Sequence, residues 1–102
     1  MSTAVAATLV DDIYAEPAVA GAFLPPILDA LSGLFHCICP CGCGAYRALP
    51  IYTGKKPSYV SWSWNGNVEK PTLSPSIRDV SGCKYHGHLT DGVWTFCADS
   101  GR

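Results

Sequence analysis

Four cysteines lie within seven residues of this chain, in the run Cys37-Ile-Cys-Pro-Cys-Gly-Cys43. Alternate residues of an extended segment hold their Cα atoms about 6–7 Å apart with parallel Cβ vectors. A disulfide instead needs converging vectors and a Cα separation of about 4.4–6.8 Å. A turn at Pro40 and Gly42 can aim several of these sulfurs at one point, and a zinc ion takes four such ligands at tetrahedral angles. The spacing therefore predicts a structural zinc site.

The residues that complete the zinc shell lie further along the chain. Downstream of the cysteine run, the residues with suitable ligand atoms are Cys83, His86, His88 and Cys97. Three sulfurs from the 39–43 loop and a fourth from Cys83 would tie distant parts of the chain together. Cys37 is an alternative ligand, and so is His86, which follows Cys83 in a Cys-x-x-His spacing that also suits zinc. The spacing alone leaves the choice of four ligands open.

The composition argues against several classes of protein. The net charge is -1, and residues 36–102 carry seven basic residues against four acidic ones. That excess is far from the dense basic patch that binds nucleic acid. No apolar stretch reaches about 18 residues, so no membrane span is expected. This charge balance favours a protein as the binding partner over nucleic acid or a membrane.

The cysteine content also bears on the compartment. Six cysteines in 102 residues are compatible with a secreted disulfide scaffold. The N-terminus, however, lacks a basic segment and carries Asp11-Asp12 where the apolar run of a signal peptide should continue. Thiols persist in a reducing compartment. We therefore expect a cytoplasmic protein whose cysteines bind metal.

Residues 1–35 are predicted to form a helical segment. The first residues that fit a 3.6-residue period are Ala4, Val5, Ala7, Leu9, Val10, Ile13 and Tyr14. Pro25-Pro26 suits the first turn of a second helix. The apolar residues of that second helix are Ile27, Leu28, Leu31, Leu34 and Phe35. Both faces are expected to pack on the core or to hold a homo-oligomer together.

From His36 onward the pattern changes to short strands separated by turn residues. Tyr46–Tyr52 and Tyr59–Trp64 are rich in aromatic and β-branched residues. The two tryptophans of the second segment could stack on a base or sugar, but the small positive charge nearby favours a place in the core. Asn65-Gly66 and Asp91-Gly92 are typical of two-residue hairpin turns.

The second of these turns sets the register of a hairpin. A two-residue loop at Asp91-Gly92 places His86 opposite Cys97, and side chains alternate between the two faces of each strand. One face then carries His86, His88 and Cys97, and the other carries the core residues Leu89, Trp94 and Phe96. The predicted fold class is α+β, with the N-terminal helical segment, residues 1–35, packed on a small zinc-stapled antiparallel β-meander, residues 36–102.

Two serines, Ser74 and Ser76, flank a proline in the run Pro71-Thr-Leu-Ser-Pro-Ser-Ile77. Serine beside proline is typical of turns. A nucleophilic serine needs a base within hydrogen-bond reach and a third group that orients the base. The bases available are His86 and His88, and the orienting carboxylates are Asp79, Asp91 and Asp99. The spacing does not show that these groups meet.

Taken together and in order, the motifs resemble those of the BubE-like family. They are Cys39-Pro-Cys-Gly-Cys-Gly44, then Leu73-Ser-Pro-Ser-Ile77, then Cys83-x-x-His86 followed by a short hairpin. Members of that family occur in phage genomes and in bacterial ubiquitin-like (Bub) operons of defence type. The operon branch is regarded as serine peptidases that act on a ubiquitin-like protein or its conjugates. The stretch from Trp64 to Ser76 is closer to the phage branch.

The resemblance covers roughly residues 36–97 and implies a role for particular residues. Cys39, Cys41, Cys43 and Cys83 would hold zinc. Ser76 would be the nucleophile and His86 its general base, with Ser74 the weaker candidate. Cys37, His88 and Cys97 are additions to the family pattern, and whether one of them joins the metal stays open.

We therefore expect a small zinc-stabilised serine hydrolase, a peptidase directed at a ubiquitin-like protein or protein conjugate in phage–host or defence biology. It would act in the cytoplasm of a bacterium or phage-infected cell. The alternative is a non-catalytic phage module that binds zinc and attaches to a host protein through residues 59–67 and the apolar helices. A redox or metal sensor that uses Cys37 and Cys97 is a third reading.

Overall fold

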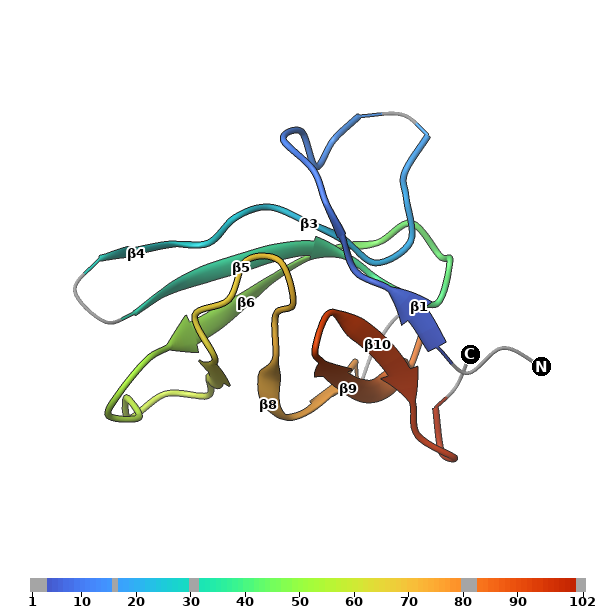
Figure 1. Ribbon diagram of the computed structural model, residues 1–102. Coiled ribbons are helices and arrows are strands. Elements are labelled where there is room, and N and C mark those ends of the chain that lie inside the picture. Colours follow the sequence, from blue (N-terminus) through green and yellow to red (C-terminus); the bar gives the residue numbers. More distant parts are fainter. Residues whose placement is uncertain (1–3, 16, 30–31, 80–82, 101–102) are drawn as a thin grey trace.

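The computed structural model describes residues 4–15, 17–29, 32–79 and 83–100, and within these ranges the chain forms ten strands and no helix (Figure 1). The strands are β1 (Ala4–Ala6), β2 (Thr8–Leu9), β3 (Ala22–Phe23), β4 (Ile27–Asp29), β5 (Ser32–Ile38), β6 (Tyr46–Tyr52), β7 (Trp62–Trp64), β8 (Leu73–Arg78), β9 (His86–Thr90) and β10 (Val93–Phe96). The described ranges accordingly include no helix of the length and apolarity that a membrane crossing requires.

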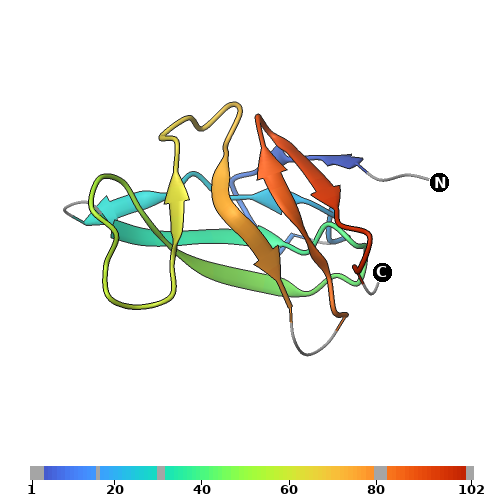
Figure 2. The ribbon, with the colours of Figure 1, turned by 90° about the horizontal axis from the view of Figure 1, so that it is seen from below.

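All ten strands belong to one sheet that curls back on itself. The strand order is β1-β10-β9-β8-β7-β6-β5-β3-β2, and β4 pairs separately with β5. The strands at the two ends of this order, β1 and β2, are joined by Ala7 alone, so the ends of the sheet must lie together. Ala7 N–H donates to Gly92 O, and Thr8 N–H donates to Gly21 O. The result is a nearly closed barrel, in which β5 and β6 cross the layer formed by β7 to β10 (Figure 2).

The prediction of an N-terminal helical segment, and with it the α+β class, is wrong. The described residues before His36 form β1 to β4 and the start of β5, with Val5 opposite Trp94 and Phe23 opposite Cys37. Apolar runs this short fit a strand period as well as a helical one, and the sheet supplies backbone partners that decide between them. Residues 1–3, 16 and 30–31, which the helical prediction included, lie outside the described residues. The helical face proposed for homo-oligomerisation is not formed.

Predictions for the second half of the chain fare better. β6 spans Tyr46–Tyr52 as expected, and the β9–β10 hairpin has the predicted register, with Leu89 opposite Trp94. Asp91 and Gly92 both have positive φ, as a type I′ turn requires. The pairing is not antiparallel throughout, because β2–β3 and β6–β7 are parallel.

The turn predicted at Asn65-Gly66 is wrong, because residues 65–72 form a longer loop between β7 and β8. The Asn65 side chain holds this loop together. It accepts hydrogen bonds from the backbone N–H groups of Asn67 and Thr72 and donates one to Lys70 O. Asparagine here acts through its side chain and not through a left-handed backbone.

The core fills the interior of the barrel. Phe23 and Phe35 stack with ring centroids 5.4 Å apart, and the Trp94 indole N–H donates to Gly21 O at 3.1 Å. The other buried apolar residues of this cluster are Cys37, Cys39, Leu49, Ile51, Leu73, Ile77, Tyr85 and Leu89. Trp62 and Trp64 pack against it half-buried, in agreement with the structural role favoured for them.

Gly87 marks the closest approach within this core. A Cβ atom at residue 87 would lie 1.8 Å from Thr95 O and 2.2 Å from the Tyr85 hydroxyl oxygen. The Tyr85 ring therefore occupies the space that a side chain would need, and its hydroxyl donates to Thr95 O at 2.6 Å. Only glycine at residue 87, between His86 and His88, leaves room for the Tyr85 ring to pack against the backbone of β9.

We predict that Gly87→Ala lowers the free energy of unfolding by about 3 kcal/mol or more, because backbone and a buried ring must move to admit the methyl group. Gly66→Ala is the control, since its Cβ meets nothing within 4 Å and only its positive φ of 79° is unfavourable. That change should cost about 1 kcal/mol. Urea denaturation of both variants measures the difference, and equal losses would contradict the packing role of Gly87.

Candidate active site and metal centre

The pairing of β8 with β9 brings together the side chains that sequence motifs assigned to chemistry. Arg78 lies opposite His86 and Ile77 opposite Gly87. Because side chains alternate along a strand, Ser76, Arg78 and His86 share the outer face of the barrel. Ser76 is then the diagonal neighbour of His86, within reach of its long side chain.

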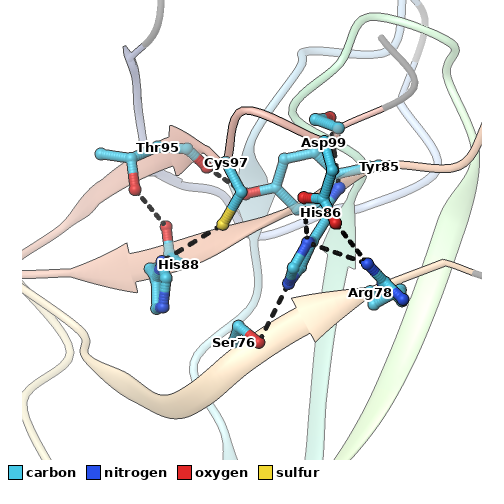
Figure 3. Close-up of polar contacts among 9 residues, drawn as sticks. Ser76, Arg78, Tyr85, His86, His88, Thr95, Cys97 and Asp99 are labelled. Atoms are coloured by element: carbon cyan, nitrogen blue, oxygen red, sulfur yellow. Dashed lines mark hydrogen bonds and ion pairs between the residues drawn. The ribbon is translucent and has the colours of Figure 1, made fainter.

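Ser76, His86 and a carboxylate form a continuous hydrogen-bonded series (Figure 3). Ser76 Oγ lies 3.2 Å from His86 Nε2, and His86 Nδ1 lies 2.6 Å from Asp99 Oδ1. When Nδ1 carries the proton and donates to Asp99, Nε2 is free to accept from the serine hydroxyl. A hydroxyl, an imidazole and a carboxylate in this order are the arrangement that serine hydrolases use.

Asp99 reaches His86 because the chain turns directly after β10. Cys97 N–H donates to His86 O at 2.8 Å, and Ser100 N–H donates back to Cys97 O at 3.0 Å. The Ser100 hydroxyl in turn accepts from His86 N–H at 3.2 Å. This turn carries the Asp99 carboxylate over the imidazole. The hydrogen bond from His86 lowers the pKa of Asp99, so its carboxylate is ionised at neutral pH.

The other candidates from the sequence lie elsewhere. Of the remaining carboxylates, Asp79 pairs with Arg47, and Asp91 occupies the β9–β10 turn. His88 is exposed, with its Nδ1 3.8 Å from Cys97 Sγ. Ser74 pairs with Ser63 in the β7–β8 ladder.

Two contacts of the site were not foreseen from the sequence. The Arg78 guanidinium donates to Asp99 Oδ2 at 2.5 Å and lies 3.4 Å from His86 Nδ1. The Trp62 indole N–H donates to the carbonyl oxygen of Ser76 at 3.0 Å. Strand alternation would have found Arg78, since it follows Ser76 by two residues. The hydrogen bond from Trp62 to Ser76 O depends on the β7–β8 pairing, which no local sequence pattern predicts.

The cysteine cluster joins the β8–β9 connection, which contains Cys83, to the β5–β6 connection, which contains the other three cysteines. The sulfurs of Cys39, Cys41, Cys43 and Cys83 all lie within 4.8 Å of one another. Cys39 Sγ is 3.3 Å from Cys41 Sγ and 3.5 Å from Cys83 Sγ. Sulfurs that share a tetrahedral zinc ion at about 2.3 Å are roughly 3.8 Å apart. The cluster is therefore compatible with a structural zinc ion.

Local backbone and charge favour this cluster. Gly42 and Gly44 have φ values of 94° and 79°, which let the loop double back. Arg47 lies 3.6 Å from Cys83 Sγ and offsets the negative charge that four thiolates bring. Burial raises the pKa of Cys43, but hydrogen bonds from the Ala45 backbone and the neighbouring thiols outweigh it and lower this pKa to about 7.

The cysteines outside the cluster have different surroundings. Cys37 points into the core, where burial raises its pKa to about 12. Cys97 lies beside His88 on the outer face. None of the six cysteines forms a disulfide. The cluster thus contains the four residues that the family resemblance named and neither of the other two.

The connection between β8 and β9 links the cluster to the Ser76–His86–Asp99 series. Asp79 N–H donates to Tyr85 O at 2.8 Å and closes the base of this connection. Cys83 lies within it, with its sulfur 3.8 Å from Asp79 Oδ2. A metal bound through Cys83 would therefore hold the chain three residues before His86.

With this geometry established, comparison with known proteins identifies the family. The sequence model of the bacterial ubiquitination-like system serine protease (BubE) matches residues 17–97, and the chain belongs to this family. The match confirms the resemblance seen in the motifs and extends it to residues 17–35. No curated protein and no solved structure matches the chain significantly.

We predict that the purified protein contains about one zinc per chain and that Cys83→Ser loses it. Cys83 contributes the only sulfur that does not come from the 39–43 loop, so its loss leaves three ligands and frees the β8–β9 connection. Cys37→Ala is the matched control and should retain the metal. Elemental analysis measures zinc directly. A folded wild type without metal would contradict the assignment, and so would equal zinc loss in both variants.

Proposed function

We propose that this chain is a zinc-stabilised serine peptidase that cleaves a ubiquitin-like protein or its conjugates. Ser76 is the nucleophile, His86 the general base and Asp99 the residue that orients and stabilises the imidazole. The observation that carries the proposal is the series of contacts from Ser76 Oγ through His86 to Asp99, at 3.2 and 2.6 Å. Membership of a family of serine proteases in ubiquitination-like systems supports the reaction type and the class of substrate.

The reaction follows from the hydrogen-bond order. His86 Nε2 takes the proton of the Ser76 hydroxyl while Oγ attacks the carbonyl carbon of the scissile bond. The resulting imidazolium is stabilised by Asp99 and then gives its proton to the leaving amine. An ester on Ser76 remains. Water, deprotonated by the same imidazole, attacks that ester, releases the carboxylic acid and restores the serine hydroxyl.

Neighbouring residues hold this arrangement in place. Arg78 binds the second oxygen of Asp99, so the carboxylate keeps one face toward His86. The hydrogen bond from Trp62 to Ser76 O fixes the strand that carries the nucleophile. Zinc, held by Cys39, Cys41, Cys43 and Cys83, would contribute stability to the loops and no reaction chemistry.

The cellular setting is a further part of the proposal. We place the protein in phage–host conflict or bacterial defence, in the cytoplasm of a bacterium or infected cell. None of the six cysteines forms a disulfide, which suits a reducing compartment. The partner is then the protein substrate itself, and neither nucleic acid nor a membrane is required.

A non-catalytic module that binds a host protein is the second candidate function. It is favoured by one observation: Tyr59 and Val60, in the segment before β7, are 50% and 76% exposed. Trp62 and Trp64 do not serve this role, because they pack against the core. Such a module would lose its partner on replacement of Tyr59 and Val60 and would tolerate Ser76→Ala.

We predict that a fluorophosphonate probe labels the wild type and that Ser76→Ala abolishes the labelling, because the probe loses fluoride only to an activated hydroxyl. Ser74→Ala is the matched control and should label at close to the wild-type rate, since Ser74 belongs to the β7–β8 ladder. Intact-protein mass spectrometry measures the adduct. Equal labelling of wild type and Ser76→Ala would remove the hydrolase proposal.

We further predict that Asp99→Asn slows probe labelling by a factor on the order of 10³–10⁴. The amide cannot accept the Nδ1 proton as a carboxylate does, and it leaves the imidazolium unstabilised. Asp91→Asn is the control, because Asp91 lies in a turn where asparagine tolerates the same positive φ. Labelling rates of the two variants are compared at one pH. A fast Asp99→Asn variant would show that this carboxylate does not serve His86.

A further inference from the structure

Cys97 lies directly beside the proposed catalytic base, and the mechanism above makes no use of it. Its backbone N–H donates to His86 O, so Cys97 lies opposite His86 across the β9–β10 pair, and its Sγ lies 3.8 Å from His88 Nδ1 (Figure 3). Ligand atoms of His86, Cys97 and Asp99 all lie within 4.8 Å of one another. A thiol, an imidazole and a carboxylate thus converge on one point, well apart in sequence from the 39–43 loop.

The chemistry of these three donors selects a particular kind of ion. Zinc accepts sulfur, imidazole nitrogen and carboxylate oxygen at about 2.0–2.3 Å, whereas magnesium and calcium require oxygen ligands. One thiolate and one carboxylate balance the two positive charges of the ion. Three protein ligands leave a fourth position, which water or the neighbouring His88, with its Nδ1 3.8 Å from Cys97 Sγ, can fill.

We propose that His86, Cys97 and Asp99 form a second zinc site, and that zinc bound there reversibly inhibits the enzyme. The inhibitory part rests on the proposed function, and the binding part does not. The proposed mechanism uses both ring nitrogens of His86, one toward Ser76 and one toward Asp99. A zinc ion on either nitrogen therefore stops proton transfer, and it also withdraws Asp99 from the imidazole.

The ligands of the two sites set the order in which the sites fill. The Arg78 guanidinium lies 3.4 Å from His86 Nδ1 and binds Asp99, so it opposes the arrival of a cation. The Arg47 guanidinium lies similarly near the cysteine cluster, 3.6 Å from Cys83 Sγ, but the cluster offers four sulfurs and needs no carboxylate that a guanidinium must first release. The cluster therefore fills first, and the second site takes zinc only when the free concentration rises. Activity would then respond to zinc without loss of the structural ion.

The test adds zinc ions alone to protein that already holds its structural equivalent. Bound zinc is measured by calorimetry and elemental analysis, and the rate of fluorophosphonate labelling is measured in parallel. Wild type should take up a second equivalent, and its labelling should slow at least tenfold as that site fills. Cys97→Ala should stop at one equivalent, and added zinc should leave its labelling at the variant's own zinc-free rate.

Three controls make the outcome decisive. Cys37→Ala keeps both sites and should behave as wild type, because Cys37 is buried in the core. Cys97→Ser serves if the alanine variant fails to fold. Cobalt substitution adds a spectroscopic readout, since loss of Cys97 removes sulfur-to-cobalt absorption from the second equivalent alone.

Two results would overturn the proposal. Wild type that stops at one equivalent has no second site, and a Cys97→Ala variant that binds a second zinc as tightly as wild type places that site elsewhere. A second equivalent that depends on Cys97, in a protein that no probe labels with or without zinc, supports the site and rejects the hydrolase. Failure of the site and failure of the function are therefore told apart.

Discussion

The pairing of β8 with β9 is the constraint on which the rest of the site depends. It sets Arg78 opposite His86 and makes Ser76 the diagonal neighbour of the imidazole. A shift of one residue would turn His86 into the barrel and bring Gly87 to the surface. The Tyr85 ring over Gly87 prevents this, because no larger residue fits beneath it. Core packing thus selects the register, and the register places the polar groups.

The cysteine cluster would support the same β8–β9 pairing from the connection between the two strands. Cys83 lies in the connection between β8 and β9, while its three partners lie in the connection between β5 and β6. A zinc ion would join two loops that are distant in sequence. A crosslink over such a long segment removes much conformational entropy from the unfolded chain and therefore stabilises the fold most. A chain of 102 residues buries a modest core, so such a crosslink can add stability that packing alone does not supply. The fold therefore places the cysteine cluster and the proposed catalytic residues close together.

Local patterns predicted the β9–β10 hairpin and β6 in the second half of this protein, but they failed on the Asn65-Gly66 turn and on the first half. The Asp91-Gly92 turn correctly predicted the β9–β10 register, because a two-residue type I′ turn fixes which residues of the two strands lie opposite each other. Motif order named Ser76, His86 and the four clustered cysteines. Residues 1–35 were predicted to be helical because apolar runs this short fit a helical period as well as a strand period. The strand partners that decide between the two, such as Trp94 for Val5, are far away in sequence. The choice of Asp99 among three carboxylates likewise needed the turn after β10. Strand alternation already places Arg78 on the face of Ser76, but its contact with Asp99 needed that same turn.

The central claim is that His86 stands hydrogen-bonded between Ser76 and Asp99 in the protein as purified. Proton NMR with ¹⁵N-labelled histidine tests it most directly, at low temperature where solvent exchange is slow. The account predicts a far-downfield proton coupled to Nδ1 of His86, assigned by its loss in His86→Gln, absent in Asp99→Asn and present in Asp91→Asn. A wild type without that resonance, or an Asp99→Asn variant that keeps it, would contradict the account.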